Sequence, residues 1–265
     1  MKDDFYTNLL DWSPNDIVSV VLDNAAYIWS SKNNETDKLL EGFISSIKWG
    51  RGLVMGEETG RIRVVDIEKK AVSAKIKHHE GRIGTIDCFG HPGNLVASGS
   101  KDNNLMVWDV RLQSTINKFQ GHKQEICGVK WSFDGNMLAS GGNDNVVSIW
   151  DLRTTKLFTK FCDHKAAIKA LAWSPHHSST LATGGGSTDK SIRIWNVNEK
   201  RCVKKVETGS QVCNLIYSTN SNELVSTHGF SFNSINIWNA KGMERVGTLT
   251  GHTYRVLYLA RSPDG

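Results

Sequence analysis

The sequence has 265 residues and a mass of 29.5 kDa, and its 39% hydrophobic and 22% charged residues exclude a disordered chain. The net charge of +5 comes from scattered lysines, so no nucleic-acid-binding stripe is predicted. No apolar run follows the first residues, so we expect neither a signal peptide nor a membrane span. No two of the five cysteines form a C-x-x-C pair, so neither a zinc ribbon nor a redox motif is predicted.

A unit of about 40 residues repeats along the chain. An aromatic residue closes an apolar segment and precedes Asp or Asn at Trp108-Asp109, Trp150-Asp151, Trp195-Asn196 and Trp238-Asn239, with degenerate copies at Trp29-Ser30 and Val65-Asp66. Measured from position 29, the spacings are 36, 43, 42, 45 and 43 residues. This period is typical of WD repeats, which recur every ~40–45 residues.

A histidine marks the start of four units, at His79, His122, His164 and His252. Trp131 follows His122 by nine residues, and the same offset applied to the other units gives starts near positions 3, 40, 79, 122, 164, 208 and 252. We predict an all-β protein with one WD-repeat β-propeller domain over residues 1–265. The propeller has seven blades in the complete protein, and the last is truncated here.

Strands are clearest in the fourth unit. Apolar segments of four to seven residues alternate with turns rich in Gly, Asn and Asp, which predicts strands over Ile126–Ser132, Met137–Gly141, Val146–Asp151 and Lys156–Phe161. Four antiparallel strands per unit are the blade of a propeller. In the seventh unit we predict an inner strand over Arg255–Ala260.

Three units contain a histidine, a hydroxyl residue, an aspartate and a tryptophan in the same order. The sets are His79, Ser98, Asp102 and Trp108; His122, Ser140, Asp144 and Trp150; and His164, Thr183, Asp189 and Trp195. One set alone could be a Ser-His-Asp triad, but a catalytic set needs a single copy in one pocket. Because this set recurs, we interpret it as a structural brace.

In such a brace the aspartate accepts from one ring nitrogen and the hydroxyl engages the other, while the indole N–H donates to the hydroxyl. The second unit has Leu40, Met55 and Thr59 at the three positions, and the sixth has Thr208 in place of histidine. We expect these two blades to depend on packing alone.

Ordered strings along nearly the whole chain resemble the fizzy and fizzy-related proteins, coactivators of the anaphase-promoting complex, a ubiquitin ligase. They are residues 4–13 (DFYTNLLDWS), 121–128 (GHKQEICG), 139–145 (ASGGNDN), 168–173 (IKALAW), 181–186 (LATGGG), 209–214 (GSQVCN) and 251–259 (GHTYRVLYL). Residues 223–229 (ELVSTHG) and 254–260 (YRVLYLA) are closer to the fizzy-related branch. Family members dock the ligase through an N-terminal motif and a C-terminal Ile-Arg tail. Neither is in these residues, so we expect a fragment that resembles the substrate-reading part.

Turns on one face of a propeller surround its central channel. The turns before the inner strands carry Asp4, Phe5, Gln211 and Arg255, and those between second and third strands carry Asn143 and Ser187. Asp4 suits a lysine, Arg255 a carboxylate, and Asn143 and Gln211 a side-chain amide. The resemblance implies that these six positions bind the Lys-Glu-Asn degron of substrates. Ser187 replaces the family's Thr, and Phe5 replaces the Tyr of the fizzy branch; the alternative is that all six are solvated loop residues.

The resemblance implies a substrate-recognition adaptor of the anaphase-promoting complex in nucleus and cytoplasm, with Lys-Glu-Asn and destruction-box degrons as ligands. The acidic anchor for the destruction box lies outside these residues, so we expect that degron to bind poorly. The alternative is a generic WD scaffold with an unrelated partner. We expect no enzyme, cofactor, metal, nucleic acid or membrane partner, and Gly184-Gly185-Gly186 lies between two strands, as a turn rather than a nucleotide cradle.

Overall fold

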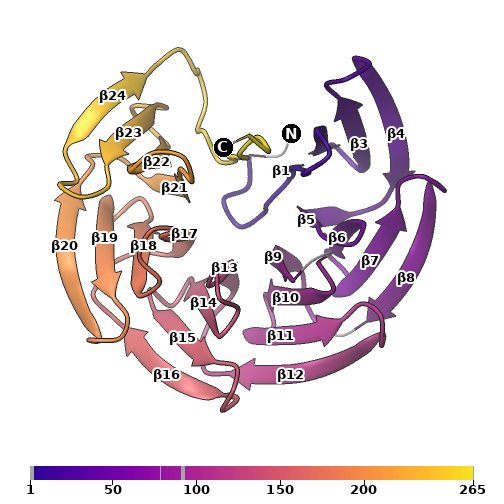
Figure 1. Ribbon diagram of the computed structural model, residues 1–265, viewed down its shortest axis with the longest axis horizontal. Helices are drawn as coiled ribbons and strands as arrows, with labels where there is room; N and C mark the ends of the chain where they lie inside the picture. Colours follow the sequence, from indigo (N-terminus) through magenta and orange to yellow (C-terminus); the bar gives the residue numbers. More distant parts are fainter. Residues whose placement is uncertain (1–2, 78, 91–92, 265) are drawn as a thin grey trace. The chain divides into compact units, whose positions relative to one another are not determined.

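The structure, a computed structural model, describes residues 3–77, 79–90 and 93–264 (Figure 1). Within those ranges the regular secondary structure is entirely β-strand, in six four-stranded sheets whose neighbouring strands are consecutive in the chain. No helix in the described part is long and apolar enough to cross a membrane. The all-β prediction is confirmed.

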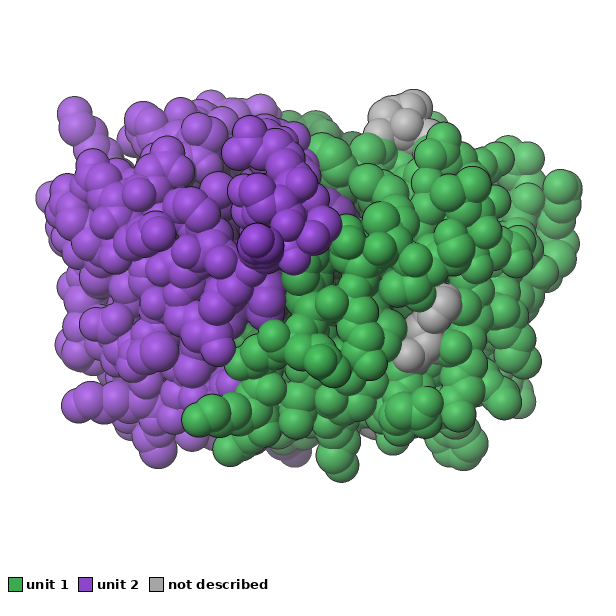
Figure 2. Space-filling model, turned by 90° about the horizontal axis from the view of Figure 1, so that it is seen from below, with its two compact units in different colours: residues 1–129, 260–264 green, residues 130–259, 265 purple. Residues whose placement is uncertain are grey.

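The described chain divides into two compact units, coloured separately in Figure 2. The first contains residues 3–129 and 260–264. Its first sheet has β1 (Leu10–Trp12), β2 (Ile17–Leu22), β3 (Ala25–Ser30) and β4 (Glu35–Glu41). The second sheet has β5 (Ile44–Trp49), β6 (Leu53–Glu57), β7 (Arg61–Asp66) and β8 (Ala71–Lys77), and the third has β9 (Ile83–Phe89), β10 (Leu95–Ser100), β11 (Asn104–Asp109) and β12 (Ser114–Gln120).

The second unit contains residues 130–259, and the chain enters it within β13 (Ile126–Trp131). The fourth sheet continues with β14 (Met137–Gly142), β15 (Val147–Asp151) and β16 (Lys156–Phe161). The fifth has β17 (Ile168–Trp173), β18 (Thr180–Gly185), β19 (Ser191–Asn196) and β20 (Arg201–Glu207), and the sixth has β21 (Val212–Tyr217), β22 (Glu223–His228), β23 (Ile235–Asn239) and β24 (Arg245–Leu249).

The four strands predicted in the fourth sequence repeat, which forms the fourth sheet, are confirmed to within one residue at each end. The inner strand predicted over Arg255–Ala260 is wrong, because this segment forms no strand. A strand needs a neighbour with unpaired backbone groups. The segment contacts the sixth sheet through the Val256 N–H, which donates to the His228 carbonyl at 3.1 Å.

Successive sheets in each unit pack face to face. In the fifth sheet Ile194 packs in a cluster with the sixth sheet, while its neighbour Trp195 packs with the fourth, where its ring stacks on Phe161 at 4.1 Å. Successive residues of a strand point to opposite faces, so a strand buried on both faces is apolar at consecutive positions. A similar cluster, which includes Val64 and Trp108, joins the second and third sheets.

The histidine brace is complete in the fifth sheet. His164 contacts Asp189 through Nδ1 and the Thr183 hydroxyl through Nε2 at 2.7 Å, and the Trp195 indole donates to the same hydroxyl at 2.8 Å. In the third sheet, His79 lies 2.9 Å from both Asp102 and Ser98.

The indoles of the third and fourth sheets differ in their contacts. Trp108 Nε1 is buried without an acceptor among residues 3–77, 79–90 and 93–264, whereas the Trp150 indole donates to Ser140 at 2.8 Å. His122 is buried in the first unit, and Asp144 lies on the β14–β15 turn of the second. The indole bond of the brace therefore varies from sheet to sheet.

The expectation that the sixth blade depends on packing alone is wrong. His228, on β22, supplies the imidazole that Thr208 lacks: its Nε2 lies 2.7 Å from the Ser226 hydroxyl, which accepts the Trp238 indole N–H at 2.7 Å. A histidine two residues from the serine on the same strand therefore replaces one from the preceding turn.

The second blade is also held by more than packing. Arg63 Nε lies 2.5 Å from Glu57, with the two side chains 13% and 11% exposed, and the Thr59 hydroxyl donates to Glu57 at 2.8 Å. Gly42 allows this ion pair, because a Cβ there would overlap the Arg63 guanidinium. An ion pair thus takes the place of the histidine brace.

Replacing Asp189 with alanine is expected to lower the free energy of unfolding by about 1–3 kcal/mol, since His164 Nδ1 then loses its buried partner. Asp163→Ala is the matched control: its side chain is 53% exposed and 3.9 Å from Arg193, so we expect a change below about 0.5 kcal/mol. Urea unfolding measures both, and equal losses would contradict the brace.

Candidate functional site

Within a sheet, the turn before the inner strand lies beside the turn that joins the second and third strands. In the third sheet, the Lys101 N–H donates to the Arg82 carbonyl at 2.8 Å, and in the fifth the Gly186 N–H donates to Ala167 at 3.0 Å. The two kinds of turn therefore share a face, as the repeat predicts.

Asp4 lies on a turn before β1 that is anchored to other sheets of the first unit. Its Oδ1 accepts the Tyr6 N–H at 2.9 Å. Asn8 pairs with β5, where its N–H donates to the Ser45 carbonyl at 3.1 Å, and its side-chain amide donates to the Gly84 carbonyl on β9 at 2.9 Å. The turn is thus fixed on the inner strands of the second and third sheets.

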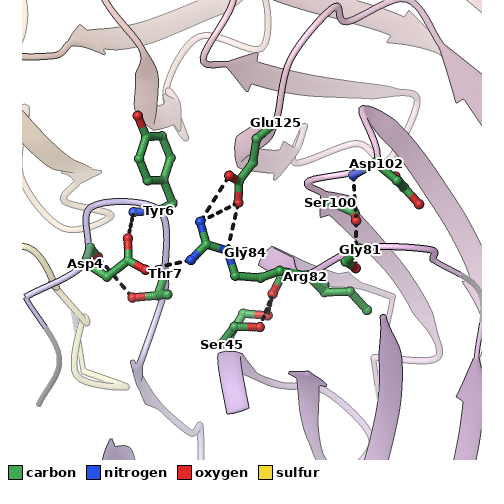
Figure 3. A network of polar contacts seen from close by, with 12 residues as sticks. Asp4, Tyr6, Thr7, Ser45, Gly81, Arg82, Gly84, Ser100, Asp102 and Glu125 are labelled. Atoms are coloured by element: carbon green, nitrogen blue, oxygen red, sulfur yellow. Dashed lines mark hydrogen bonds and ion pairs between the residues drawn. The ribbon is translucent and has the colours of Figure 1, made fainter. Parts of the chain in front are cut away.

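Arg82 joins Asp4 to Glu125 (Figure 3). Its Nε and Nη2 each donate to Glu125 at 3.0 Å, and its Nη1 donates to Asp4 Oδ2 at 2.7 Å. Burial raises the pKa of Glu125, against the lowering effect of Arg82. The guanidinium also lies 5.8 Å from the centre of the Tyr6 ring.

The aromatic residues of this turn have different environments. Phe5 is 7% exposed and meets Tyr6 edge-on, with ring centres 5.6 Å apart. Burial, followed by the nearby Cys127, Glu125 and Asp4, raises the pKa of Tyr6 above its usual 10.0. Phe5 is therefore part of the core, and the half-buried Tyr6 is the more accessible ring.

In the second unit, Gln211 and Arg255 are in contact. Arg255 Nη1 lies 3.4 Å from Gln211 Oε1, and the guanidinium lies 5.7 Å from the centre of the Phe230 ring. The Gly229 N–H donates to the Gln211 carbonyl at 3.0 Å, and a Cβ at Gly229 would lie 2.7 Å from Gln211 Oε1. A side chain at 229 would therefore displace the Gln211 amide from its present position.

The segment that carries Arg255 is held by a lysine on β17, the inner strand of the fifth sheet. The Lys169 ammonium, on β17, donates to the Leu257 carbonyl at 3.1 Å and lies 4.7 Å from the Tyr258 ring centre. Lys169 is 5% exposed. A buried cation thus fixes the backbone two residues after Arg255.

Asn143 and Ser187 lie on the turns β14–β15 and β18–β19 of the second unit. Asn143 is half-buried and Ser187 is exposed. The first turn is closed by the Asn145 N–H on Gly142 at 3.2 Å, and the second by the Asp189 N–H on Gly186 at 3.1 Å. The six predicted peptide-binding residues are therefore divided, with Asp4 and Phe5 in the first unit and the other four in the second.

Sequence reasoning selected Gln211 and Arg255 but missed Arg82 and Glu125. Gln211 directly precedes β21, just as Arg82 precedes β9 and Glu125 precedes β13. The repeat therefore indicated these residues, because the position directly before the inner strand is polar in each of these three sequence repeats. Phe230 lies on the β22–β23 turn, the same kind of turn as those of Asn143 and Ser187, but it is apolar and was not selected when polar residues were sought there.

Six repeated four-stranded sheets, with buried indoles bonded to hydroxyl groups and polar turns beside the inner strands, define a WD-repeat β-propeller protein. Residues 1–265 match the CDC20/Fizzy WD40 domain. The chain belongs to this family, and the fold and the family predicted from sequence are both confirmed.

Relatives and a solved structure agree with this assignment. The chain is 43% identical to the B-type cell cycle switch protein ccs52A of Medicago truncatula, of which it covers 57%, and to FIZZY-RELATED 2 of Arabidopsis thaliana, of which it covers 56%. It is 42% identical to anaphase-promoting complex subunit cdh1 of Dictyostelium discoideum and covers 40% of it. In each case all of this chain is matched, so it spans about half the length of these relatives.

A chain in the crystal structure of the mitotic checkpoint complex is 39% identical, with a TM-score of 0.96 over 100% of this chain and 83% of that one. The chain is therefore similar in sequence to relatives named for cell-cycle switching and for the anaphase-promoting complex, and similar in both sequence and fold to a chain of the mitotic checkpoint complex.

Proposed function

We propose that the chain is a substrate-recognition adaptor for the anaphase-promoting complex, a ubiquitin ligase, in nucleus and cytoplasm. Its ligand is a short peptide with the degron sequence Lys-Glu-Asn, and destruction-box degrons are a second, weaker ligand class. The observation that carries the proposal is the contact between Arg255 and Gln211 on an anchored turn, in a member of the CDC20/Fizzy family.

The chemistry of each unit suits part of such a peptide. Arg255 can pair with the glutamate through a charge-assisted bond, while Gln211 and Asn143 can satisfy the asparagine amide. In the first unit, Asp4 and Glu125 pair with Arg82. With Glu58 the carboxylates outnumber Arg82 and Lys101, and this excess of negative charge suits the lysine. Anchored turns bind a peptide at low conformational cost.

The chemistry of the braces supports an adaptor over an enzyme. Thr183 is 0% exposed and its hydroxyl is held between His164 and the Trp195 indole. In the third sheet His79 and Ser98 are also 0% exposed. A nucleophile must reach its substrate, and these hydroxyl groups are enclosed in the protein core.

Arg255→Ala is expected to lower the affinity for a fluorescent Lys-Glu-Asn peptide about tenfold to a hundredfold. This corresponds to the loss of a charge-assisted pair that contributes about 1.5–3 kcal/mol. Fluorescence anisotropy measures the affinity. Thermal stability should change little, because Arg255 is partly exposed and outside the core clusters.

Lys156→Ala on the exposed outer strand β16 is the matched control and should leave affinity unchanged. If Arg255→Ala binds the peptide as well as the parent does, the adaptor proposal loses its site, and a WD scaffold with another partner becomes the better description.

A further inference from the structure

Arg82 divides its guanidinium between two carboxylates (Figure 3). Its Nε and Nη2 form a two-pronged pair with Glu125, at 3.0 Å each, and Nη1 reaches Asp4 Oδ2 at 2.7 Å. The side chains of Arg82, Glu125 and Asp4 are 17%, 10% and 28% exposed. Asp4 is thus the most accessible member of the group.

Both carboxylate oxygens of Asp4 are engaged within the protein. Oδ1 accepts the Tyr6 N–H at 2.9 Å, and Oδ2 accepts Arg82 Nη1. These two bonds come from different directions and fix the carboxylate plane, because Tyr6 belongs to the same turn and Arg82 precedes β9. The orientation of Asp4 is therefore set before any ligand arrives.

An incoming cation meets a carboxylate whose two oxygens already have donors. A guanidinium binds best as a planar fork that needs two acceptors side by side, and Arg82 already occupies part of that edge. An ammonium is a compact charge with rotatable donors and has no such requirement. The geometry therefore favours lysine over arginine as the ligand.

The site remains attractive to a cation despite the presence of Arg82. Burial acts to lower the pKa of Arg82, but Glu125, Asp4 and Glu58 raise it above its usual value, so the guanidinium stays charged. Three carboxylates, Asp4, Glu125 and Glu58, outnumber the two cations that act on this group, Arg82 and Lys101, and leave an excess of negative charge.

We propose that Arg82, held by Glu125, is a positioning residue that makes Asp4 selective for lysine over arginine in the peptide. This inference rests on the proposed function, in which Asp4 reads the basic residue of Lys-Glu-Asn. It assigns the selectivity to a side chain that does not itself bind the peptide.

The test measures the affinities of Lys-Glu-Asn, Arg-Glu-Asn and Lys-Ala-Asn peptides for the parent and for Arg82→Met, Arg82→Lys and Glu125→Gln. The parent should prefer the Lys-Glu-Asn peptide to the Arg-Glu-Asn peptide by about tenfold. Arg82→Met should reduce this ratio below about threefold, and Glu125→Gln should give an intermediate ratio. The loss caused by Ala in place of the peptide glutamate should be the same in all four proteins, because Asp4 does not read that residue.

Arg82→Lys keeps a charge but cannot form the two-pronged pair with Glu125, so this variant should retain only part of the preference for the Lys-Glu-Asn peptide. If Arg82→Met fails to fold, Arg82→Lys and Glu125→Gln still test the proposal. Equal weakening of all three peptides by Arg82→Met would assign Arg82 a purely structural role and overturn the proposal. Tighter binding of Lys-Glu-Asn by that variant would show competition between Arg82 and the peptide lysine, which also overturns it. A parent that binds no peptide overturns the proposed function and this inference with it.

Discussion

Replacing Arg63 with methionine is expected to lower the free energy of unfolding by about 3 kcal/mol. Methionine removes the cation that lies 2.5 Å from Glu57 and leaves a carboxylate 11% exposed, with the Thr59 hydroxyl as its remaining described partner. Much of the cost is the desolvation of an unpaired charge. Urea unfolding of the parent and the variant at neutral pH measures it.

The double variant Arg63→Met with Glu57→Leu is the decisive control. A buried ion pair replaced by apolar residues of similar volume is often nearly neutral, so the double variant should regain most of the loss. Arg111→Met is the matched single control, because that arginine is 56% exposed in its pair with Asp109 and its loss should be far smaller than that of Arg63. If the double variant loses as much free energy of unfolding as Arg63→Met and Glu57→Leu do in sum, the pairing is contradicted.

The features predicted best from sequence are those that repeat. Tryptophan spacing predicted the repeated sheets, and turn residues placed strands such as Lys156–Phe161 at the observed positions. The brace of the fifth sheet followed from hydrogen-bonding capacity alone, because a buried imidazole needs two partners.

The features that sequence could not predict are non-repeating substitutions within a blade. His228 takes over from the absent histidine by approaching Ser226 along its own strand, and Arg63 approaches Glu57 only because Gly42 leaves room. Neither arrangement follows a spacing rule. Arg82 is an intermediate case, since its repeat position was visible but its partner Asp4 comes from a turn 78 residues away.

Protein stability is expected to fall by about 3 kcal/mol between pH 6.5 and pH 4 because of His228 alone. The imidazole is 0% exposed on β22. Burial, with a smaller effect of Arg245, lowers the pKa of His228 from its usual 6.5 to about 4. The folded protein therefore holds this imidazole neutral, in contact with the Ser226 hydroxyl that also accepts the Trp238 indole.

The direction of the effect follows from proton binding. Between these two pKa values the unfolded chain binds a proton at His228 and the folded chain does not, so acid favours unfolding. The stability contribution is fully present above about pH 6.5 and is lost as the pH falls towards 4. Asp102 affects stability at a lower pH than His228 does. Burial raises the pKa of Asp102, but the hydrogen bond with His79 and those from backbone N–H groups outweigh burial and hold the pKa below its ordinary 3.8.

His228→Gln isolates the contribution, because glutamine can keep a hydrogen bond to Ser226 and does not titrate. Unfolding in urea at half-unit steps from pH 7 to pH 4 should show a shallower loss for the variant, and the parent and variant curves should converge by about 3 kcal/mol over this range. Other histidines titrate equally in both proteins, so only the difference between the curves reports on position 228. Parallel curves would mean that His228 takes up its proton over the same pH range in the folded and the unfolded protein, and the buried neutral imidazole of the sixth sheet would then be the wrong description.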